Sequence, residues 1–434
     1  GGTGRKPGED QKSEVARGRP MGELERIMRE GAALHEAGRY DDALALYDDA
    51  VGRWPTLALL WNNRGNTLLE LGFLDQATKS YQQALQLAPS LHDSRVALAT
   101  CLQMQGEVQQ ALVECAKVLK VAPEHAEAHW NYALLLLLQG NYTVGFREYE
   151  WRWKKRRFTS PMREFSQPRW SGGDLSGKRI LIYAEQGFGD TLQFCRYLPL
   201  LVERGAQVLF ECHQPLVALM QSLGTGITVL PFDRTLPDFD CHLPLLSLPY
   251  MLGSSLETIP ANIPYLAAPE QVLPFWQSVM PTVAGKKIGL CWAGKSYPDP
   301  GRRCPPGFLA PLSTLPNVTW VSLQIAEKEF RQPFPLLDLT MLVQDFADTA
   351  ALLEQLDLVI TIDTAVAHLA GALGKPTWLL LPFAPDWRWG LERSDCPWYP
   401  TMRLFRQQEA GDWEPVVRQL LSELHKPVAD VSRT

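Results

Sequence analysis

The chain changes its pattern of hydrophobic and polar positions after about residue 158. Before that point, apolar residues recur at the three- and four-residue spacing of amphipathic helices, and the whole pattern repeats every 34 residues. One glycine keeps its place in each repeat, at Gly38, Gly72, Gly106 and Gly140. Glycine between two helical stretches is typical of a tight turn, because it accepts positive φ. Residues 21–158 are therefore expected to form an α-solenoid of about four helix pairs.

Small residues recur at a second position of each repeat, where two helices must approach closely. This position holds Gly31, Gly65, Ala99 and Ala133. The period and the small residues resemble those of the tetratricopeptide repeat. The resemblance implies a curved stack whose concave surface binds a peptide or protein. Further positions in register are Ala43, Ala77, Ala111 and Gly145, and a proline closes the first three units at Pro55, Pro89 and Pro123.

In the tetratricopeptide family, an asparagine two residues before the first small position often contacts the backbone of a ligand. Asn63 and Asn131 match that position, whereas Arg29 and Ala97 occupy it in the other repeats. The resemblance therefore implies Asn63 and Asn131 as partner-binding residues. The other interpretation is that the repeats only dimerise the protein or brace the next domain, because a repeat fold does not by itself specify a ligand.

The solenoid ends in a run of aromatic and basic residues from Tyr149 to Phe158. Stacking combined with positive charge is how RNA or an anionic membrane surface is held. The alternative is an amphipathic last helix, with Trp151 and Trp153 packed against the following domain. We favour the alternative, because short basic runs usually form solvated faces.

Beyond a linker at residues 159–178, short apolar runs alternate with helical patterns. Strands separated by helices predict parallel sheets, here in two Rossmann-like domains over residues 179–270 and 285–425. Such sheets bind ligands at the carboxyl ends of their strands, so a cleft is expected between the two domains. The expected strands are Ile180–Tyr183, Ala206–Cys212, Ile227–Pro231, Cys241–Leu248, Ile288–Trp292, Val318–Leu323, Leu356–Ile362 and Thr377–Leu381.

A first candidate site follows the first expected strand. The stretch from Ala184 to Asp190 is a turn that opens a helix, and Gly187 and Gly189 let a ligand approach the backbone, while the helix N-terminus favours an anion. The stretch is not G-x-G-x-x-G, so it gives little support to dinucleotide binding. Asp190 lies at the positive helix end, which keeps it ionised and able to accept a proton from a hydroxyl. Its other interpretation is a helix cap.

A second candidate site is a strand that runs straight into a helix. Asp363 or Thr364 would be the N-cap, which exposes the backbone N–H groups of Thr364, Ala365 and Val366 to a phosphate. His368 lies one turn further along and can reach the same anion. Convergent polar groups at such a junction favour a functional site over a structural histidine.

The two sites carry a family resemblance. The stretch Asp363–Pro376 resembles the C-terminal signature of the heptosyltransferases, which form glycosyltransferase family 9, and Gly187–Asp190 resembles their N-terminal Gly-Asp motif. The similarity extends from Lys178 to about Leu420. It implies the GT-B fold of two Rossmann-like domains, and transfer of a sugar from a nucleotide donor with inversion and without a required metal or cofactor.

The resemblance also implies roles. Asp190 would be the general base on the acceptor hydroxyl, and Asp363, Thr364 and His368 would hold the donor's diphosphate. The implied nucleotide-sugar site comprises Gln186, Gly187, Gly189, Lys295, Arg303, Asp363, Thr364, Ala365 and His368.

A basic residue is also implied in the loop after the first strand of the second domain. Lys295, Arg302 and Arg303 occupy that loop, and any of them could neutralise the leaving phosphate. In a later segment, Trp387 or Trp389 would either stack on a base or sugar or simply pack.

The acceptor is not specified by these motifs. Tetratricopeptide repeats fused to a GT-B enzyme are similar in architecture to the O-GlcNAc transferases, which implies a protein or glycan acceptor recruited by the repeats. The alternatives are a catalytically inactive scaffold that senses a nucleotide-sugar and a nucleotide-sugar epimerase. Homo-oligomers are also expected to be possible, since such repeats often self-associate.

Composition narrows the class further. The 434 residues include 42 basic and 48 acidic side chains, so the net charge of −6 argues against nucleic acid as a partner. No apolar run has the roughly 18–20 residues of a membrane span, and residues 1–20 resemble a disordered or added tail rather than a signal peptide. The eight cysteines form no C-x-x-C pair, which is typical of a reducing compartment. We therefore expect a cytoplasmic protein without a transmembrane segment.

Two apparent metal motifs are set aside. Asp238 and Asp240 form an Asp-x-Asp that precedes a buried strand, and the pairs Cys212-His213 and Cys241-His242 do not have a known zinc spacing. The sequence therefore predicts no metal site.

Overall fold

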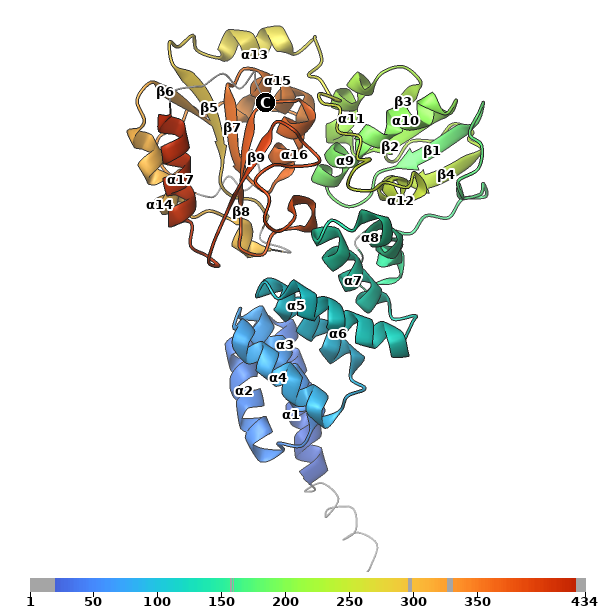
Figure 1. Cartoon of the computed structure of the whole chain (residues 1–434), viewed down its shortest axis with the longest axis vertical. Helices are drawn as coiled ribbons and strands as arrows, with labels where there is room; N and C mark the ends of the chain where they lie inside the picture. The colour runs from blue at the N-terminus through green and yellow to red at the C-terminus, as the bar shows by residue number, and fades with distance from the viewer. Residues whose placement is uncertain (1–19, 157, 159, 296–298, 326–330, 427–434) are drawn as a thin grey trace, which may run out of the picture. The chain divides into compact units, whose positions relative to one another are not determined.

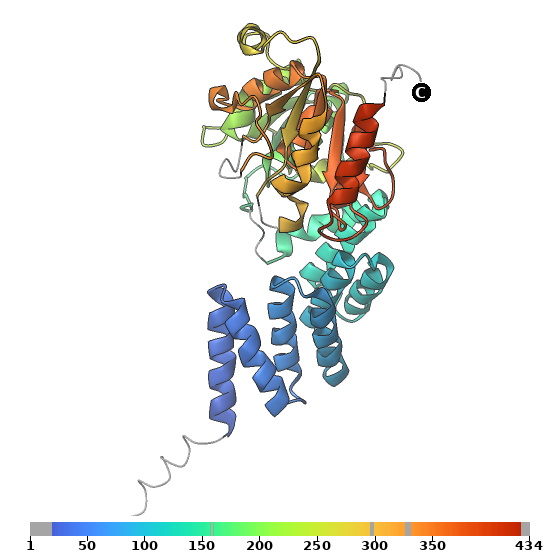
Figure 2. The ribbon, with the colours of Figure 1, turned by 90° about the vertical axis from the view of Figure 1, so that its left-hand side faces the viewer.

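The computed structural model describes residues 20–156, 158, 160–295, 299–325 and 331–426 of the chain. The chain divides into two units, Gly1–Tyr132 and Ala133–Thr434. The first unit is a row of packed helix pairs (Figures 1 and 2). Its helices are α1 (Pro20–Glu36), α2 (Tyr40–Arg53), α3 (Ala58–Glu70), α4 (Leu74–Leu87), α5 (His92–Met104) and α6 (Val108–Val121), followed by the first half of α7 (Ala126–Leu138).

The periodic glycines and small residues have the roles that the sequence predicts. Gly38, Gly72, Gly106 and Gly140 all lie in turns between paired helices, with φ between +73° and +85°. The two glycines among the small positions face an aromatic ring of the next helix: a Cβ on Gly31 would overlap the Tyr47 hydroxyl, and a Cβ on Gly65 would lie 2.8 Å from the buried ring of Tyr81. A larger residue there would push the helices apart. Helical repeats are thus confirmed.

The second unit begins with the end of α7, α8 (Tyr142–Tyr149) and the 3-10 helix η2 (Glu150–Lys154). Two parallel sheets follow. The first sheet has the order β3-β2-β1-β4. Its strands are β1 (Arg179–Tyr183), β2 (Gln207–Cys212), β3 (Ile227–Pro231) and β4 (Cys241–Pro244), and its helices are α9 (Phe188–Phe194), α10 (Leu198–Glu203), α11 (Gln214–Met220) and α12 (Leu248–Met251).

The second sheet has the order β6-β5-β7-β8-β9, and all of its pairings are parallel. Its central strand β7 is buried at every position, as expected for a parallel strand covered on both faces. The strands are β5 (Lys286–Cys291), β6 (Val318–Ser322), β7 (Leu358–Ile362), β8 (Thr377–Leu381) and β9 (Met402–Arg406). The helices are α13 (Leu273–Val279), α14 (Pro306–Leu309), α15 (Phe346–Glu354), α16 (Ala365–Ala372) and α17 (Glu414–His425).

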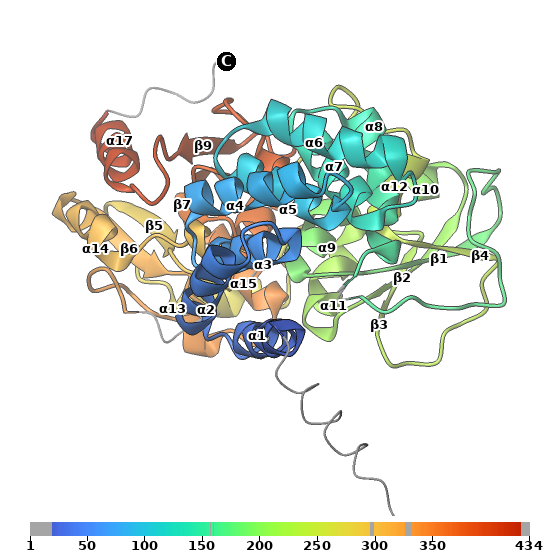
Figure 3. The ribbon, with the colours of Figure 1, turned by 90° about the horizontal axis from the view of Figure 1, so that it is seen from below.

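The two sheets of the second unit are joined through helices. Figures 1 and 3 show α9, α11 and α15 between them, and α9 packs against α16 while α11 packs against α15. Both α9 and α16 start at the carboxyl end of a strand. The two motifs singled out by the sequence therefore meet between the sheets.

Two details of the strand prediction were wrong. The expected strand Cys241–Leu248 ends at Pro244, because the chain turns into a 3-10 helix and Pro249 then lies in the first turn of α12. The edge strand β9 was not predicted. The stretch expected as a linker also pairs with β4, through hydrogen bonds from Trp170 N–H to the His242 carbonyl and from His242 N–H to the Pro168 carbonyl.

Candidate active site

The first motif forms a tight turn between β1 and α9. Gln186 has φ +60°, a left-handed conformation, and Gly187 returns to extended backbone at the N-cap of α9. The Oδ2 atom of Asp190 accepts a hydrogen bond from the backbone N–H of Gly187 at 3.3 Å. Asp190 thus closes the first turn of α9 with one oxygen and presents the other to a different part of the unit.

The second oxygen of Asp190 contacts Arg388 of the 3-10 helix η9 (Trp387–Trp389). Arg388 is only 9% exposed, and it also donates to Gln193 Oε1 and, at 3.0 Å, to Asp386 Oδ1. Burial raises the pKa of Asp190 above its ordinary value, while the positive charge of Arg388 opposes that rise. Asp190 is therefore a partly buried carboxylate that is paired with a buried guanidinium.

The second motif forms the junction between β7 and α16. Thr364 is the N-cap of α16, and its hydroxyl lies 3.2 Å from that of Thr361 without capping the helix. Within the described residues, no N-cap side chain therefore satisfies the first N–H groups of α16, among them that of Ala365. An uncapped helix start of this kind favours an anion.

The helix η9 connects the two motifs. Arg388 contacts Asp190, and the adjacent Trp389 donates its indole N–H to Asp363 Oδ2 at 2.9 Å. Burial, and next the negative charge of Asp386, raise the pKa of Asp363 to about 6. Sequence reasoning considered Trp389 as a stacking or packing residue and missed Arg388. The available signal was an arginine between two tryptophans, shortly after a buried strand.

His368 is buried beside the first motif. Its Nδ1 lies 2.7 Å from the hydroxyl of Tyr399, and its ring stacks on Trp389 with centroids 5.3 Å apart. A Cβ on Gly189 would lie 3.0 Å from Cδ2 of His368. Burial lowers the pKa of His368 well below its ordinary value, so the ring is neutral at physiological pH. A phosphate bound beside His368 would therefore contact an uncharged imidazole.

The basic loop lies after β5. Arg302 donates to the carbonyl of Lys295 at 2.7 Å, and Arg303 donates to the carbonyl of Gly294 at 2.9 Å. The charge of Arg302 acts to lower the pKa of Asp363, so Arg302 is electrostatically linked to the second motif. The exposed Lys295 borders residues 296–298, which lie outside the described residues.

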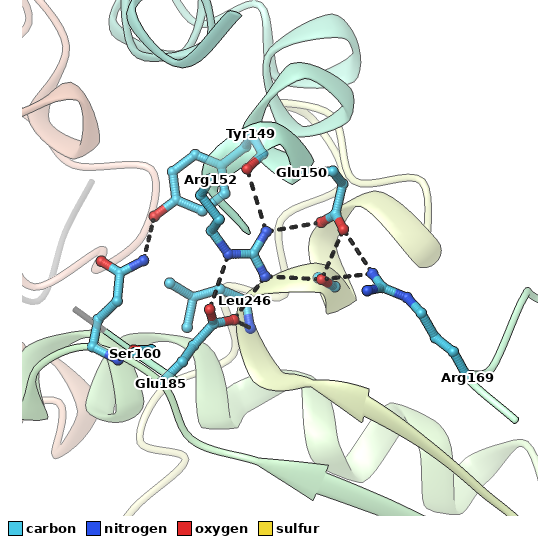
Figure 4. A network of polar contacts seen from close by, with 9 residues as sticks. Tyr149, Glu150, Arg152, Ser160, Arg169, Glu185 and Leu246 are labelled. Carbon is cyan, nitrogen blue, oxygen red and sulfur yellow. Dashed lines mark hydrogen bonds and ion pairs between the residues drawn. The ribbon is translucent and has the colours of Figure 1, made fainter. Parts of the chain in front are cut away.

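A buried ion pair fixes the residue that precedes the first turn. Arg152 of η2 donates to both oxygens of Glu185, with Nε–Oε2 at 2.9 Å and Nη2–Oε1 at 2.7 Å (Figure 4). The two side chains are 0% and 1% exposed. Glu185 also accepts from the backbone N–H of Leu246, and Arg152 donates further to Ser247 and Glu150. The basic run is therefore not a uniformly solvated face, because Arg152 is part of the core.

Gln186 is also held by this network. Its backbone N–H donates to Ser160 Oγ at 2.8 Å, and its side-chain amide donates to the Tyr149 hydroxyl at 3.4 Å (Figure 4). The side chain points toward the end of α8. Its assignment to the nucleotide-sugar site stays a prediction.

The aromatic and basic run also borders a cavity of about 570 Å³. Trp151 and Trp153 are both half-buried there, and the exposed Lys154 lies 4.6 Å from the ring of Trp151. The complete lining is Glu150, Trp151, Trp153, Lys154, Met162, Arg163, Arg169, Tyr183 and His242.

The two asparagines of the repeats contact the preceding helix pair. Asn131 Nδ2 donates to Thr100 Oγ1 at 3.0 Å and to the Val96 carbonyl at 3.3 Å. Asn63 Nδ2 lies 3.8 Å from the sulfur of Met28. Both amides therefore contribute to packing between repeats, and their partner-binding role stays a prediction.

The apparent metal motifs do not come together. Strand β1 lies between β2 and β4, so the Cys212-His213 and Cys241-His242 pairs are not on adjacent strands. Asp240 Oδ2 accepts a hydrogen bond from the backbone N–H of Arg179 at 2.8 Å. Among the residues with described positions, no cluster of three or more His, Cys, Asp or Glu side chains could hold a metal ion. Over the same residues, every helix is too short or too polar to cross a bilayer.

Comparisons with protein families match both parts of the chain. Residues 28–61, 58–91 and 116–150 match tetratricopeptide repeat models, and residues 343–381 match glycosyltransferase family 9 (heptosyltransferase). The family 9 match covers α15, β7, α16 and β8. The chain thus combines tetratricopeptide repeats with a parallel α/β region, one segment of which matches the family 9 model.

The chain is also similar to individual proteins. Protein FlbA of Caulobacter vibrioides is 29% identical over 425 residues, which cover 90% of this chain and 71% of that protein. General transcription factor 3C polypeptide 3 of Homo sapiens is 33% identical over 81 residues, which are 18% of this chain and 9% of that protein. Among solved structures, YrrB, a TPR protein with an unusual peptide-binding site, shares 18% identity at a TM-score of 0.27. That match covers 29% of this chain and 64% of YrrB.

Proposed function

We propose that this chain is an inverting glycosyltransferase that needs no metal and moves a sugar from a nucleotide-sugar to a hydroxyl of a protein or glycan. Its two parallel sheets would be the Rossmann-like domains of a GT-B enzyme, with the acceptor on residues 179–270 and the donor on residues 285–425. One observation carries the proposal: α9, which bears Asp190, packs against α16, whose first N–H groups no N-cap side chain of the described residues satisfies. Asp190 and the phosphate-binding N-terminus of α16 would then face the acceptor and the donor when both are bound.

In the proposed reaction, Asp190 takes the proton of the acceptor hydroxyl as its oxygen attacks the anomeric carbon. The new carbon–oxygen bond forms on the side opposite the nucleotide. The bond from the sugar to the phosphate oxygen breaks at the same time, and the nucleotide leaves with that electron pair. The N-terminus of α16 and Arg302 would stabilise the negative charge that builds on the leaving phosphate.

The repeats would recruit the acceptor. Tetratricopeptide repeats are protein-interaction modules, and Asn63 and Asn131 are the residues that we propose for contact with a partner. Such recruitment would raise the local concentration of the acceptor near Asp190. This role distinguishes the enzyme from one that acts on a small substrate alone.

The second candidate is a scaffold whose α/β region binds a nucleotide-sugar without transferring it. The observation that favours it is the contact between Asp190 and Arg388, because a carboxylate held by a cation is a poor base. The two functions differ in whether sugar is transferred.

The first experiment is a thermal-shift panel with UDP, GDP, ADP, CDP and their common sugar conjugates. A ligand at 100 times its Kd adds about 2.7 kcal/mol to the free energy of unfolding, which gives a clear shift. The stabilising nucleotide-sugar is then tested for release of its nucleotide with wild type and Asp190→Asn. Release by wild type that falls at least about 100-fold in the variant supports the enzyme. Binding without release supports the scaffold.

A further inference from the structure

The proposed function leaves a conflict at Asp190. A general base must be free to take a proton, yet Asp190 is in contact with the buried guanidinium of Arg388. The cation stabilises the ionised carboxylate and so weakens it as a base. If the proposed function holds, on which this inference rests, Arg388 must move off Asp190 before the acceptor reacts.

Arg388 has a second carboxylate partner that can hold it when Asp190 is released. Asp386 Oδ1 accepts from Nη1 of Arg388 at 3.0 Å and from the backbone N–H of Arg388 at 3.1 Å. The Asp386 side chain is 37% exposed, compared with 16% for Asp190. Asp386 therefore anchors the guanidinium from the more solvated side.

The guanidinium also has donors to spare. An arginine carries five N–H groups, and the contacts with Gln193, Asp190 and Asp386 use three of them. The other two, one on each Nη, make no hydrogen bond in the part of the chain that the structure describes, although the guanidinium also lies 4.7 Å from the ring of Trp387 and 5.9 Å from that of Phe194. Spare N–H groups on a guanidinium match the oxygens of a phosphate in geometry and charge.

The surrounding negative charges favour a cation at this place for the binding of an anionic donor. Asp190, Asp363 and Asp386 all interact electrostatically with Arg388. A phosphate that approaches the N-terminus of α16 meets these three carboxylates, which repel it. Arg388 is the cation that contacts two of the three. When a phosphate binds, the guanidinium of Arg388 would pair with the phosphate oxygens instead of with Asp190.

We propose that Arg388 binds the phosphate of the nucleotide-sugar, and that the phosphate displaces Asp190 from the guanidinium and so frees it to act as the base. Donor binding and base activation are then a single exchange of partners at Arg388. The base becomes active only when the leaving group is in place. The donor therefore binds before the acceptor is deprotonated.

Competition for one guanidinium makes the two events reciprocal. Removing the charge of Asp190 frees Arg388 and must strengthen phosphate binding. A simple loss of repulsion would also strengthen it, but that gain would not depend on Arg388. The double variant Arg388→Gln/Asp190→Asn separates the two causes.

The test is calorimetric titration of the full-length chain with inorganic pyrophosphate. We expect Arg388→Gln to weaken binding at least about 10-fold, and Asp190→Asn to strengthen it about 3- to 10-fold. In the double variant the gain should vanish. The matched control is Arg393→Gln, which breaks an exposed ion pair with Asp395 and should leave the affinity within about twofold of wild type.

Two results would overturn the inference: an unchanged affinity in Arg388→Gln, or a gain from Asp190→Asn that persists in the double variant. If Arg388→Gln does not fold, Arg388→Lys replaces it. Lysine keeps the charge but lacks the planar pair of donors, so binding should weaken several-fold, and unchanged binding would again overturn the inference.

The proposed function fails by a different result. Pyrophosphate binding that responds to these variants, with no release of nucleotide from any nucleotide-sugar, would overturn the glycosyltransferase and keep the anion site. Normal sugar transfer by Arg388→Gln would keep the enzyme and overturn the role of Arg388.

Discussion

Gly189 and His368 lie against each other, so that a Cβ on residue 189 would stand 3.0 Å from Cδ2 of the imidazole. The histidine has little room to retreat, because Tyr399 holds its Nδ1 and Trp389 covers its ring. The absence of a side chain at residue 189 thus sets how closely α9 approaches α16. That distance in turn places Asp190 relative to the second motif.

The Gly189→Ala variant tests this contact. We expect it to lower the free energy of unfolding by about 1–3 kcal/mol, since the added methyl overpacks a rigid site. Thermal or urea unfolding measures the change. The control for stability is Gly187→Ala in the same turn, where a Cβ would meet nothing within 4 Å. Equal stability of the two variants would show that α9 and α16 approach less closely.

Arg152→Met tests the ion pair with Glu185. The variant leaves a buried carboxylate without its cation, so it should lose about 3–5 kcal/mol of stability. The double variant Arg152→Met/Glu185→Gln should recover a large part of the loss, because the uncompensated charge is gone. The control is Arg147→Met, whose side chain is 58% exposed and 3.9 Å from Glu148. A loss no larger than that of the control would contradict a buried pair.

Asp363→Asn tests the raised pKa of Asp363. In the unfolded chain an aspartate has a pKa of about 3.9, and in the fold that of Asp363 is about 6. Ionisation thus costs stability as the pH rises from about 4 to 6, and the full cost is present above 6. Asparagine removes it and can still accept the indole N–H of Trp389.

The melting temperature of Asp363→Asn relative to wild type should therefore depend on pH. We expect no gain at pH 4 and a gain at pH 7.5 that corresponds to about 1–2 kcal/mol. The measurement is a pair of thermal scans at each pH. A difference that is the same at both values would place the pKa of Asp363 near its ordinary range.

Asn131→Ala and Asn63→Ala form a matched pair in the repeats. Asn131 donates two hydrogen bonds to the preceding helix pair, and the Asn63 side chain hydrogen-bonds to Tyr47 and lies 3.8 Å from the Met28 sulfur. Each variant should therefore lose about 1–2 kcal/mol of stability. A variant as stable as wild type would contradict the contacts of that asparagine. A drop in acceptor binding beyond the loss of stability would support the partner-binding role.

The sequence predicted the helices and strands that depend on patterns between residues close together in the chain. The helix pairs follow from a period that sets one glycine turn per repeat, and the buried strands follow from continuous apolar runs. The strand β9 was missed because arginines at Arg403 and Arg406 interrupt its apolar pattern, as is common at the edge of a sheet. Edge strands carry a weaker signal, since one side of their ladder meets no partner.

The sequence predicted the residues of the two motifs of the candidate site, but not the arginine that contacts Asp190. Asp190 and Asp363 were found because each stands in a motif at the end of a strand. Arg388 was missed, because its contact with Asp190 joins residues 198 positions apart and depends on how the sheets of the second unit pack. The role of Arg152 was missed because its partner Glu185 lies 33 residues further along the chain, in the turn that follows β1.

The boundary at Ala133 has a consequence for protein engineering. The second half of α7, together with α8, belongs with the α/β region, where Arg152 neutralises Glu185 and Tyr149 accepts a hydrogen bond from Gln186. A chimera that joined foreign repeats at residue 158 would lose Tyr149 and Arg152, and the buried carboxylate of Glu185 would have no cation beside it. A graft placed before residue 133 keeps both residues. Exchanging the repeats to redirect the protein to a new target thus has a natural splice point one helix pair earlier than the periodicity suggests.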